Sequence, residues 1–269
     1  MGIVAVLAFG VFATRIGVRD DILACLALAM TPIFYVSSVT SKDYIWALGF
    51  IMLSLLAALD GAPLFAGIFL GLATGCRLTS LGMLVPVLLV LIGASGREGR
   101  LRKIVALTLS WAVMSTLFFV PVFARYGADF LSFYEKHARP DWGTVLERGT
   151  IEVWGTLGVL GLVIVGIGYG VKLASKKRLP ASALSPARHF YVATAFAAAI
   201  VIYVTAYLRL PDQAGYLLPL TPAVLLLAAL YVVCASNLFS DSVRLSDSGA
   251  FCRSFLQRYS GRGYFRRPS

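Results

Sequence analysis

The sequence predicts an all-α protein, a polytopic bundle of about nine transmembrane helices. Of its 269 residues, 59% are hydrophobic and 14% are charged, and the mean hydropathy is +0.82, which is far above the values of soluble domains. The apolar runs are mostly about 14–21 residues long, and a helix of about 20 residues crosses the hydrocarbon core of a bilayer. A transmembrane β-barrel would show shorter segments of alternating polarity instead. An integral membrane protein is therefore expected.

Charged residues and turn residues separate the predicted segments. The segments run over 3–14, 22–38, 44–59, 62–75, 78–93, 104–122, 151–171, 189–207 and 216–236. An odd number of spans places the two ends of the chain on opposite sides of the membrane. At about 1.5 Å per residue, segment 62–75 reaches only about 21 Å, short of a core about 30 Å thick. It is predicted either to cross the membrane or to form a re-entrant pair with 78–93.

The basic residues orient the bundle. One set of loops, together with the C-terminal tail, holds 17 of the 24 Lys and Arg residues, and the positive-inside rule places this set in the cytoplasm. The rule also explains the net charge of +11 without a nucleic-acid partner. The prediction is a helical domain over 1–236 and a basic, disordered cytoplasmic tail over 237–269. The outer loops are expected at 39–43, 123–150 and 208–215.

Two charged residues in an outer turn and one after a short apolar segment are candidates for chemistry. Lys42 and Asp43 lie side by side between two apolar runs, and Arg77 follows the Gly-rich segment "FAGIFLGLATGC". Asp43 either takes part in a site or stabilises the start of a helix, where a carboxylate is favoured. Lys42 either binds substrate or extends its charge to the membrane interface. Arg77 is predicted to bind a phosphate group, provided it faces a polar cavity.

The other candidates lie in the two remaining outer loops. A plain hydrated loop is the alternative for the motif "EKHARPDW", where one His beside one Asp is weak evidence for a metal site. The four cysteines show no CxxC spacing, so no metal or disulfide framework is predicted. The candidates for substrate binding in these loops are His137, Arg139, Asp141, Arg209, Gln213 and Tyr216.

Three stretches together resemble the GT-C superfamily of membrane glycosyltransferases, in the branch of the protein mannosyltransferases and lipid A aminoarabinose transferases. They are "LALAMTPIFYVSSVTSKDY" (26–44), "FAGIFLGLATGCRLTSLGMLVPVLLVLI" (65–92) and "YLLPLTPAVLLLAAL" (216–230). The resemblance covers roughly 1–235. It implies sugar transfer from a polyprenyl-phosphate donor on the extracytoplasmic side of a bacterial inner membrane. It places Asp43 near the reaction centre and Arg77 near the donor phosphate, and it leaves the sugar, the acceptor and any divalent metal open.

The chain departs from the family pattern in two places. Family members begin with a span and a large outer loop that carries the main catalytic acid, whereas Met1 opens directly into what resembles the second span. A truncated start is therefore expected. Many members also carry Arg before the Tyr that corresponds to Tyr216, where this chain has Gly215; Arg209 is the candidate substitute.

A membrane glycosyltransferase is the leading functional hypothesis, with Asp43 as the catalytic residue. Two other classes stay open. A transporter or flippase-like protein would use broken helices, which the Gly-rich segment 62–75 permits. A non-catalytic assembly partner would fit a chain without the first catalytic loop. The oligomeric state is not predicted.

Overall fold

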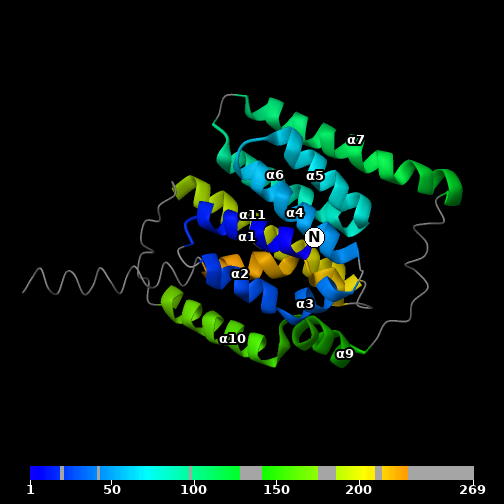
Figure 1. Cartoon of the computed structure of the whole chain (residues 1–269). Helices are drawn as coiled ribbons and strands as arrows, with labels where there is room; N and C mark the ends of the chain where they lie inside the picture. The colour runs from blue at the N-terminus through cyan, green and yellow to red at the C-terminus, as the bar shows by residue number, and fades with distance from the viewer. Residues whose placement is uncertain are drawn as a thin grey trace, which may run out of the picture.

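The structure is a computed structural model in which residues 1–18, 21–40, 43–96, 99–127, 141–174, 186–209 and 214–229 are described. All regular elements in these ranges are helical (Figure 1), which confirms the all-α prediction. The predicted tail over 237–269 lies outside the described residues. The elements are α1 (Gly2–Arg15), α2 (Asp21–Met30), α3 (Pro32–Val39), α4 (Asp43–Leu59), α5 (Pro63–Cys76), η1 (Leu78–Met83), α6 (Leu84–Ala94), α7 (Arg100–Tyr126), α9 (Trp142–Glu147), η3 (Arg148–Glu152), α10 (Val153–Ala174), α11 (Pro186–Arg209) and η4 (Ala214–Leu217). A further apolar helix covers Leu220–Ala229.

Prolines begin several of these helices. Pro32 and Pro63 stand at the first positions of α3 and α5, where the missing N–H costs no helical hydrogen bond. Pro32 also divides the predicted segment 22–38 into α2 and α3, whose axes are bent by 66°. The apolar periodicity of the sequence runs through this break and does not reveal it.

The buried core is centred on α4, which contacts α1, α5 and α6. The side chains of Leu48, Ile51 and Met52 in α4 are almost fully buried. The Phe12 and Phe196 rings pack edge to face with centroids 5.8 Å apart and join α1 to α11. The Ser54 hydroxyl donates a 2.7 Å hydrogen bond to the Ala66 carbonyl, which ties α4 to α5. In Figure 1, α7 lies on one flank of this core and α10 on the opposite flank.

A row of glycines brings α5 against α7. Gly67, Gly71 and Gly75 recur every fourth residue and therefore share one face of α5. A Cβ atom added at these positions would run into Ser110, Met114 and Phe118 of α7, respectively. Small residues at this spacing allow helix backbones to approach closely within membranes. The Gly-rich composition of this segment is plain in the sequence, whereas its packing against α7 was not predicted.

The prediction of about nine membrane spans is wrong for the described part of the chain. By length and composition, Arg100–Tyr126 and Phe190–Arg209 can cross a membrane, and the bent pair of α2 and α3 makes a third if it counts as one span. The shorter apolar helices among the described residues, which are Gly2–Arg15, Asp43–Leu59, Pro63–Cys76, Leu78–Ala94 and Leu220–Ala229, have 10–17 residues. At about 1.5 Å per residue they reach only about 15–26 Å, less than the thickness of a hydrocarbon core.

The flanks of the bundle expose apolar side chains. On α7, Leu101, Val105, Leu109, Val113 and Leu117 recur every fourth residue and are 53–75% exposed. Further exposed side chains on α10 are Leu157, Leu160, Val163, Ile164 and Ile167. Soluble monomers rarely expose extended apolar patches, so these two rows fit contact with lipid or with other protein surfaces.

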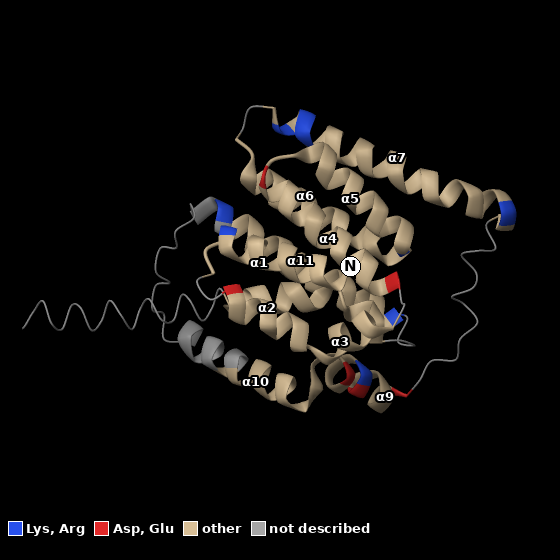
Figure 2. Cartoon of the chain, in the orientation of Figure 1, with Lys and Arg blue, Asp and Glu red and all other residues tan. Residues whose placement is uncertain are grey.

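Charged side chains gather at the two ends of the bundle, and the helices between them are almost free of charge (Figure 2). At one end, termed the Arg15 end, α1 ends, α2, α7 and α11 begin, and α4 turns into α5. Its charged residues are Arg15, Asp21, Asp60, Arg100, Arg102, Lys103 and Arg188. At the opposite end, termed the Asp43 end, α4 begins, α5, α7 and α11 end, and α9 and η3 are located. Its charged residues are Asp43, Arg77, Arg125, Asp141, Glu147, Arg148, Glu152 and Arg209. At the Arg15 end, Arg15 pairs with Asp60 and Arg188 donates a 3.0 Å hydrogen bond to the Leu59 carbonyl. Among these side chains, basic residues outnumber acidic ones only at the Arg15 end.

Candidate functional site

Three of the predicted site residues meet at the Asp43 end. Asp43 opens α4, Arg77 follows the last residue of α5, and Tyr216 lies in η4. They are distant in the sequence, and the antiparallel course of α4 and α5 brings the first two to the same end of the bundle. The backbone of Arg77 is extended, with φ −149° and ψ 123°, because the helix ends there and the chain turns into η1.

The Arg77 guanidinium is held between two tyrosine rings. Its Cζ lies 3.4 Å from the ring centroid of Tyr44 and 5.1 Å from that of Tyr216, within the range of cation–π attraction. The two rings meet edge to face with centroids 6.3 Å apart. Only 14% of the Arg77 side chain is exposed. The tyrosines therefore fix the position of the cation at the rim of an apolar bundle.

Asp43 pairs with Arg77 from the solvent side. Arg77 Nη1 donates to Asp43 Oδ1 over 3.5 Å, which is long for a charge-assisted hydrogen bond. The Asp43 side chain is 55% exposed, four times the fraction of its partner. The pair therefore joins a cation that is fixed by packing to a carboxylate that is mostly exposed to solvent.

Gly215 makes room for this arrangement. A Cβ atom there would lie 2.5–2.9 Å from three ring carbons of Tyr44. Any side chain at this position would displace the ring that supports Arg77. A large side chain such as arginine therefore has no room at position 215 unless Tyr44 moves.

Tyr203 lies beneath the cluster and was not predicted from the sequence. Its side chain is 1% exposed, and its polar neighbours are Arg77 and Ser80. Its hydroxyl faces the Ser80 side chain, but no described group meets the geometry of a hydrogen bond to it. A buried hydroxyl without a partner is uncommon, because its desolvation is not repaid. Hydropathy could not reveal Tyr203, since it lies within an apolar helix.

A pocket of about 400 Å³ opens beside Asp43. It lies where the N-terminal end of α1 meets the end of α3 and the start of α4. Asp43 is its charged side chain, and hydroxyl and aromatic groups surround it. The lining residues are Met1, Gly2, Ser38, Val39, Thr40, Asp43, Ile45 and Trp46.

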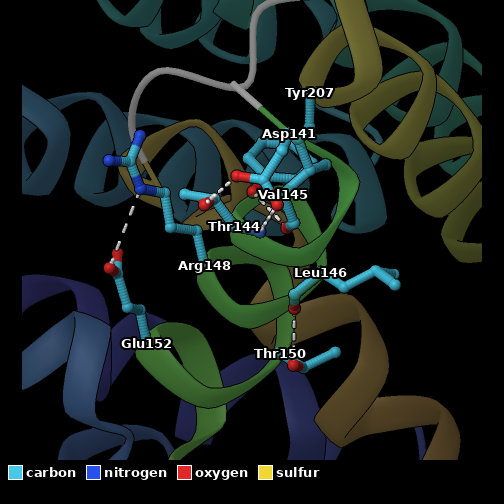
Figure 3. Close-up of polar contacts among 8 residues, drawn as sticks. All are labelled: Asp141, Thr144, Val145, Leu146, Arg148, Thr150, Glu152 and Tyr207. Atoms are coloured by element: carbon cyan, nitrogen blue, oxygen red, sulfur yellow. Dashed lines mark hydrogen bonds and ion pairs between the residues drawn. The ribbon is translucent and has the colours of Figure 1, made fainter. Parts of the chain in front are cut away.

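A second polar group at the same end is built on α9 and η3 (Figure 3). Asp141 caps α9, because its Oδ2 accepts hydrogen bonds from the Gly143 and Thr144 amides at 3.0 and 3.3 Å. The Thr144 hydroxyl donates to Asp141 Oδ1 at 2.5 Å. These hydrogen bonds, that of the Thr144 hydroxyl above all, lower the pKa of Asp141. Asp141 is thus a helix cap, which neither of the two interpretations of its loop anticipated.

Contacts around Arg148 and Tyr207 complete this second group. Arg148 Nε lies 4.0 Å from Glu152 Oε1, and the Thr150 hydroxyl donates to the Leu146 carbonyl (Figure 3). The Tyr207 hydroxyl donates a buried 2.7 Å hydrogen bond to the Val145 carbonyl, which fixes α9 to α11. These contacts hold the element in place, and its cation, Arg148, is 34% exposed, more than twice the 14% of Arg77.

Two of the remaining predicted residues are described. Arg209 ends α11, and Asp141 belongs to the second group. Lys42, His137, Arg139 and Gln213 lie outside the described residues. Among the described residues, no group of three or more His, Cys, Asp or Glu side chains has the arrangement of a metal site.

Comparison with known proteins gives no match to a protein-family model, a curated protein or a solved structure.

Proposed function

We propose that this protein is an integral membrane glycosyltransferase of GT-C type that transfers a sugar from a polyprenyl-phosphate donor at the Asp43 end. The observation that carries the proposal is the Arg77 guanidinium, fixed by Tyr44 and Tyr216 and paired with Asp43 beside a pocket. A cation and a carboxylate at one polar rim are the two groups that transfer from a phosphate ester requires.

The apolar flanks support a place within the bilayer. The exposed row on α7 and the apolar face of α10 would contact lipid, and the charged ends would lie at the two interfaces. The excess of basic side chains at the Arg15 end favours a cytoplasmic position for that end. The Asp43 end then faces the extracytoplasmic side, in a bacterial inner membrane by the GT-C resemblance.

The proposed reaction divides the work between two residues. Arg77 binds the donor phosphate and stabilises the charge that develops as the bond from the sugar C1 to the phosphate oxygen breaks. The acceptor hydroxyl or amine attacks C1 and forms the new glycosidic bond. Asp43 accepts the proton that the acceptor loses, and the polyprenyl phosphate leaves with the bonding electrons. The pocket beside Asp43 is the proposed acceptor site.

A transporter is the second candidate, and broken helices favour it. α2 and α3 meet at a 66° bend, and η1 interrupts the chain between α5 and α6. Interrupted helices often surround the substrate sites of transporters. The charged side chains described here lie at the ends of the bundle, whereas transport sites lie near the bilayer midplane, so transfer at one rim is preferred.

Transfer can be measured with the full chain in nanodiscs, polyprenyl-phosphate sugars as donors and lipid or peptide acceptors. We expect Asp43→Ala to lose at least 100-fold in rate, as removal of a general base typically does. Glu152→Ala is the matched control, because it removes another acidic side chain from the same end. Unaltered transfer by folded Asp43→Ala would refute the site assignment, and solute flux in proteoliposomes without transfer would favour the transporter.

A further inference from the structure

We infer that Asp43 is a resident anion on Arg77, and that the phosphate of a polyprenyl-phosphate ligand displaces it. Donor binding would thereby release the carboxylate that the acceptor needs. The inference rests on the proposed function only in taking the ligand to be the sugar donor. The exchange itself is a property of the Arg77 site.

The unequal exposure of the two partners indicates which of them moves. Arg77 is 14% exposed and lies against Tyr44 and Tyr216, whereas Asp43 is 55% exposed. Displacing Arg77 would break two ring contacts and uncover a buried cation. Displacing Asp43 requires only the rotation of a short side chain whose surroundings are mostly open. The ligand therefore replaces the carboxylate and leaves the cation in place.

The geometry of the ion pair favours exchange. A single contact of 3.5 Å uses little of the guanidinium, which can offer two parallel N–H groups to one anion. A phosphate presents several acceptor oxygens and a higher charge, and bidentate contacts between Arg and phosphate are among the stronger charge-assisted interactions. A phosphate that can approach the Arg77 guanidinium should therefore bind it more strongly than the Asp43 carboxylate does.

The exchange would order the reaction. Without donor, one oxygen of the Asp43 carboxylate is engaged by Arg77. With donor bound, the phosphate neutralises Arg77, and the carboxylate turns toward the pocket that it already lines. Acceptor activation before donor binding would be suppressed. Asp43 would consequently weaken donor binding while enabling transfer.

The test is equilibrium binding of decaprenyl phosphate to the full chain in nanodiscs of zwitterionic lipid, with decaprenol as the matched lipid without phosphate. Asp43→Asn keeps the size of the side chain and its capacity to begin α4. We expect it to bind decaprenyl phosphate about two- to fivefold more tightly, the range that a partly exposed ion pair allows. Affinity for decaprenol should not change.

Further variants isolate the exchange from other effects. Arg77→Gln should lose the preference for phosphate over alcohol, and Asp43→Asn added to Arg77→Gln should have no effect. Glu152→Gln controls for the loss of any negative charge at this end, and it should leave affinity within twofold. Asp43→Ser replaces Asp43→Asn if the latter does not fold. Equal or weaker phosphate binding by the Asp43 variants would overturn the inference.

Each of the two proposals can be refuted without refuting the other. Tighter phosphate binding by Asp43→Asn with no sugar transfer by the wild-type chain would refute the glycosyltransferase and retain the exchange. Sugar transfer by the wild type with unchanged phosphate binding by Asp43→Asn would retain the enzyme and refute the exchange.

Discussion

The Trp111 indole N–H donates a 3.1 Å hydrogen bond to the Thr74 hydroxyl and so connects α7 to α5. The Thr74 hydroxyl in turn donates to the Leu70 carbonyl one turn earlier in α5, at 2.8 Å. Thr74 is 2% exposed, so the bond is shielded from water. It lies beside the glycine row and adds a directional contact to close backbone packing.

Removing the acceptor of this bond should destabilise the pair of helices. Thr74→Val leaves a buried indole N–H without a partner, and we expect a loss of about 1–3 kcal/mol in the free energy of unfolding. Trp111→Phe removes the donor as well as packing area. The losses of the two single variants should add up to more than the loss of the double variant. Thermal unfolding in a fixed detergent would detect this difference. Strict additivity would show that the bond contributes nothing.

The glycine row predicts a strong dependence on position. At Gly71 an added methyl group would collide with Met114, and the backbone of α7 is close behind. Gly71→Ala should therefore cost about 1–3 kcal/mol through overpacking. Gly161→Ala in α10 is the control, because an added Cβ there meets nothing within 4 Å. It should be neutral or stabilising by up to about 1 kcal/mol. Equal effects on unfolding would contradict the packing of α5 on α7.

Two buried tyrosines should respond to loss of the hydroxyl in opposite directions. Tyr207→Phe removes a 2.7 Å hydrogen bond to the Val145 carbonyl and should lower stability by about 0.5–1.5 kcal/mol. Tyr203→Phe removes a buried hydroxyl that has no partner among the described residues, so stability should rise by about 1 kcal/mol. Paired melting curves in one detergent test both. A destabilised Tyr203→Phe would show that the hydroxyl is engaged.

The Asp141 cap predicts a pH dependence confined to α9. Hydrogen bonds from Thr144 lower the pKa of Asp141 in the folded state. The stability that the carboxylate gives is therefore complete above its unfolded pKa of about 3.9 and is lost as pH falls through the lower folded value. Amide exchange at Thr144, corrected for intrinsic rates, should accelerate below pH 4. Asp141→Asn should show no such acid step, and an unchanged step would exclude Asp141 as its source.

The ends of the helices were largely predictable, because charged and turn residues cannot stay in an apolar interior. The break at Pro32 was not, since the apolar run continues through it. Segments such as 44–59 and 78–93 were delimited correctly but were counted as spans, although they are shorter than a hydrocarbon core. The expected nine spans therefore gave way to two or three by length. The GxxxGxxxG spacing of Gly67, Gly71 and Gly75 was a signal that could have predicted the contact between α5 and α7.

The candidate site, too, was predictable only in part. The sequence predicted that Asp43 and Arg77 lie on one side, since that follows from counting helices. It could not predict their contact, because the two residues are 34 positions apart and the segment between them is placed by packing. The stacking of Arg77 on Tyr44 depends on how α4 is rotated about its axis. The fit of Gly215 against the same ring depends on a segment more than 170 residues away.

The edge position of α7 sets the order in which the bundle comes apart. Only 11% of its apolar window is buried, against 33% for the window of α11, and its chief neighbour is α5. Elements with few buried contacts open at a lower free-energy cost than the whole fold. α7 should therefore detach as a separate cooperative unit while the core around α4 persists. The resulting intermediate would expose the glycine face of α5, which a small-residue face of another helix could cover.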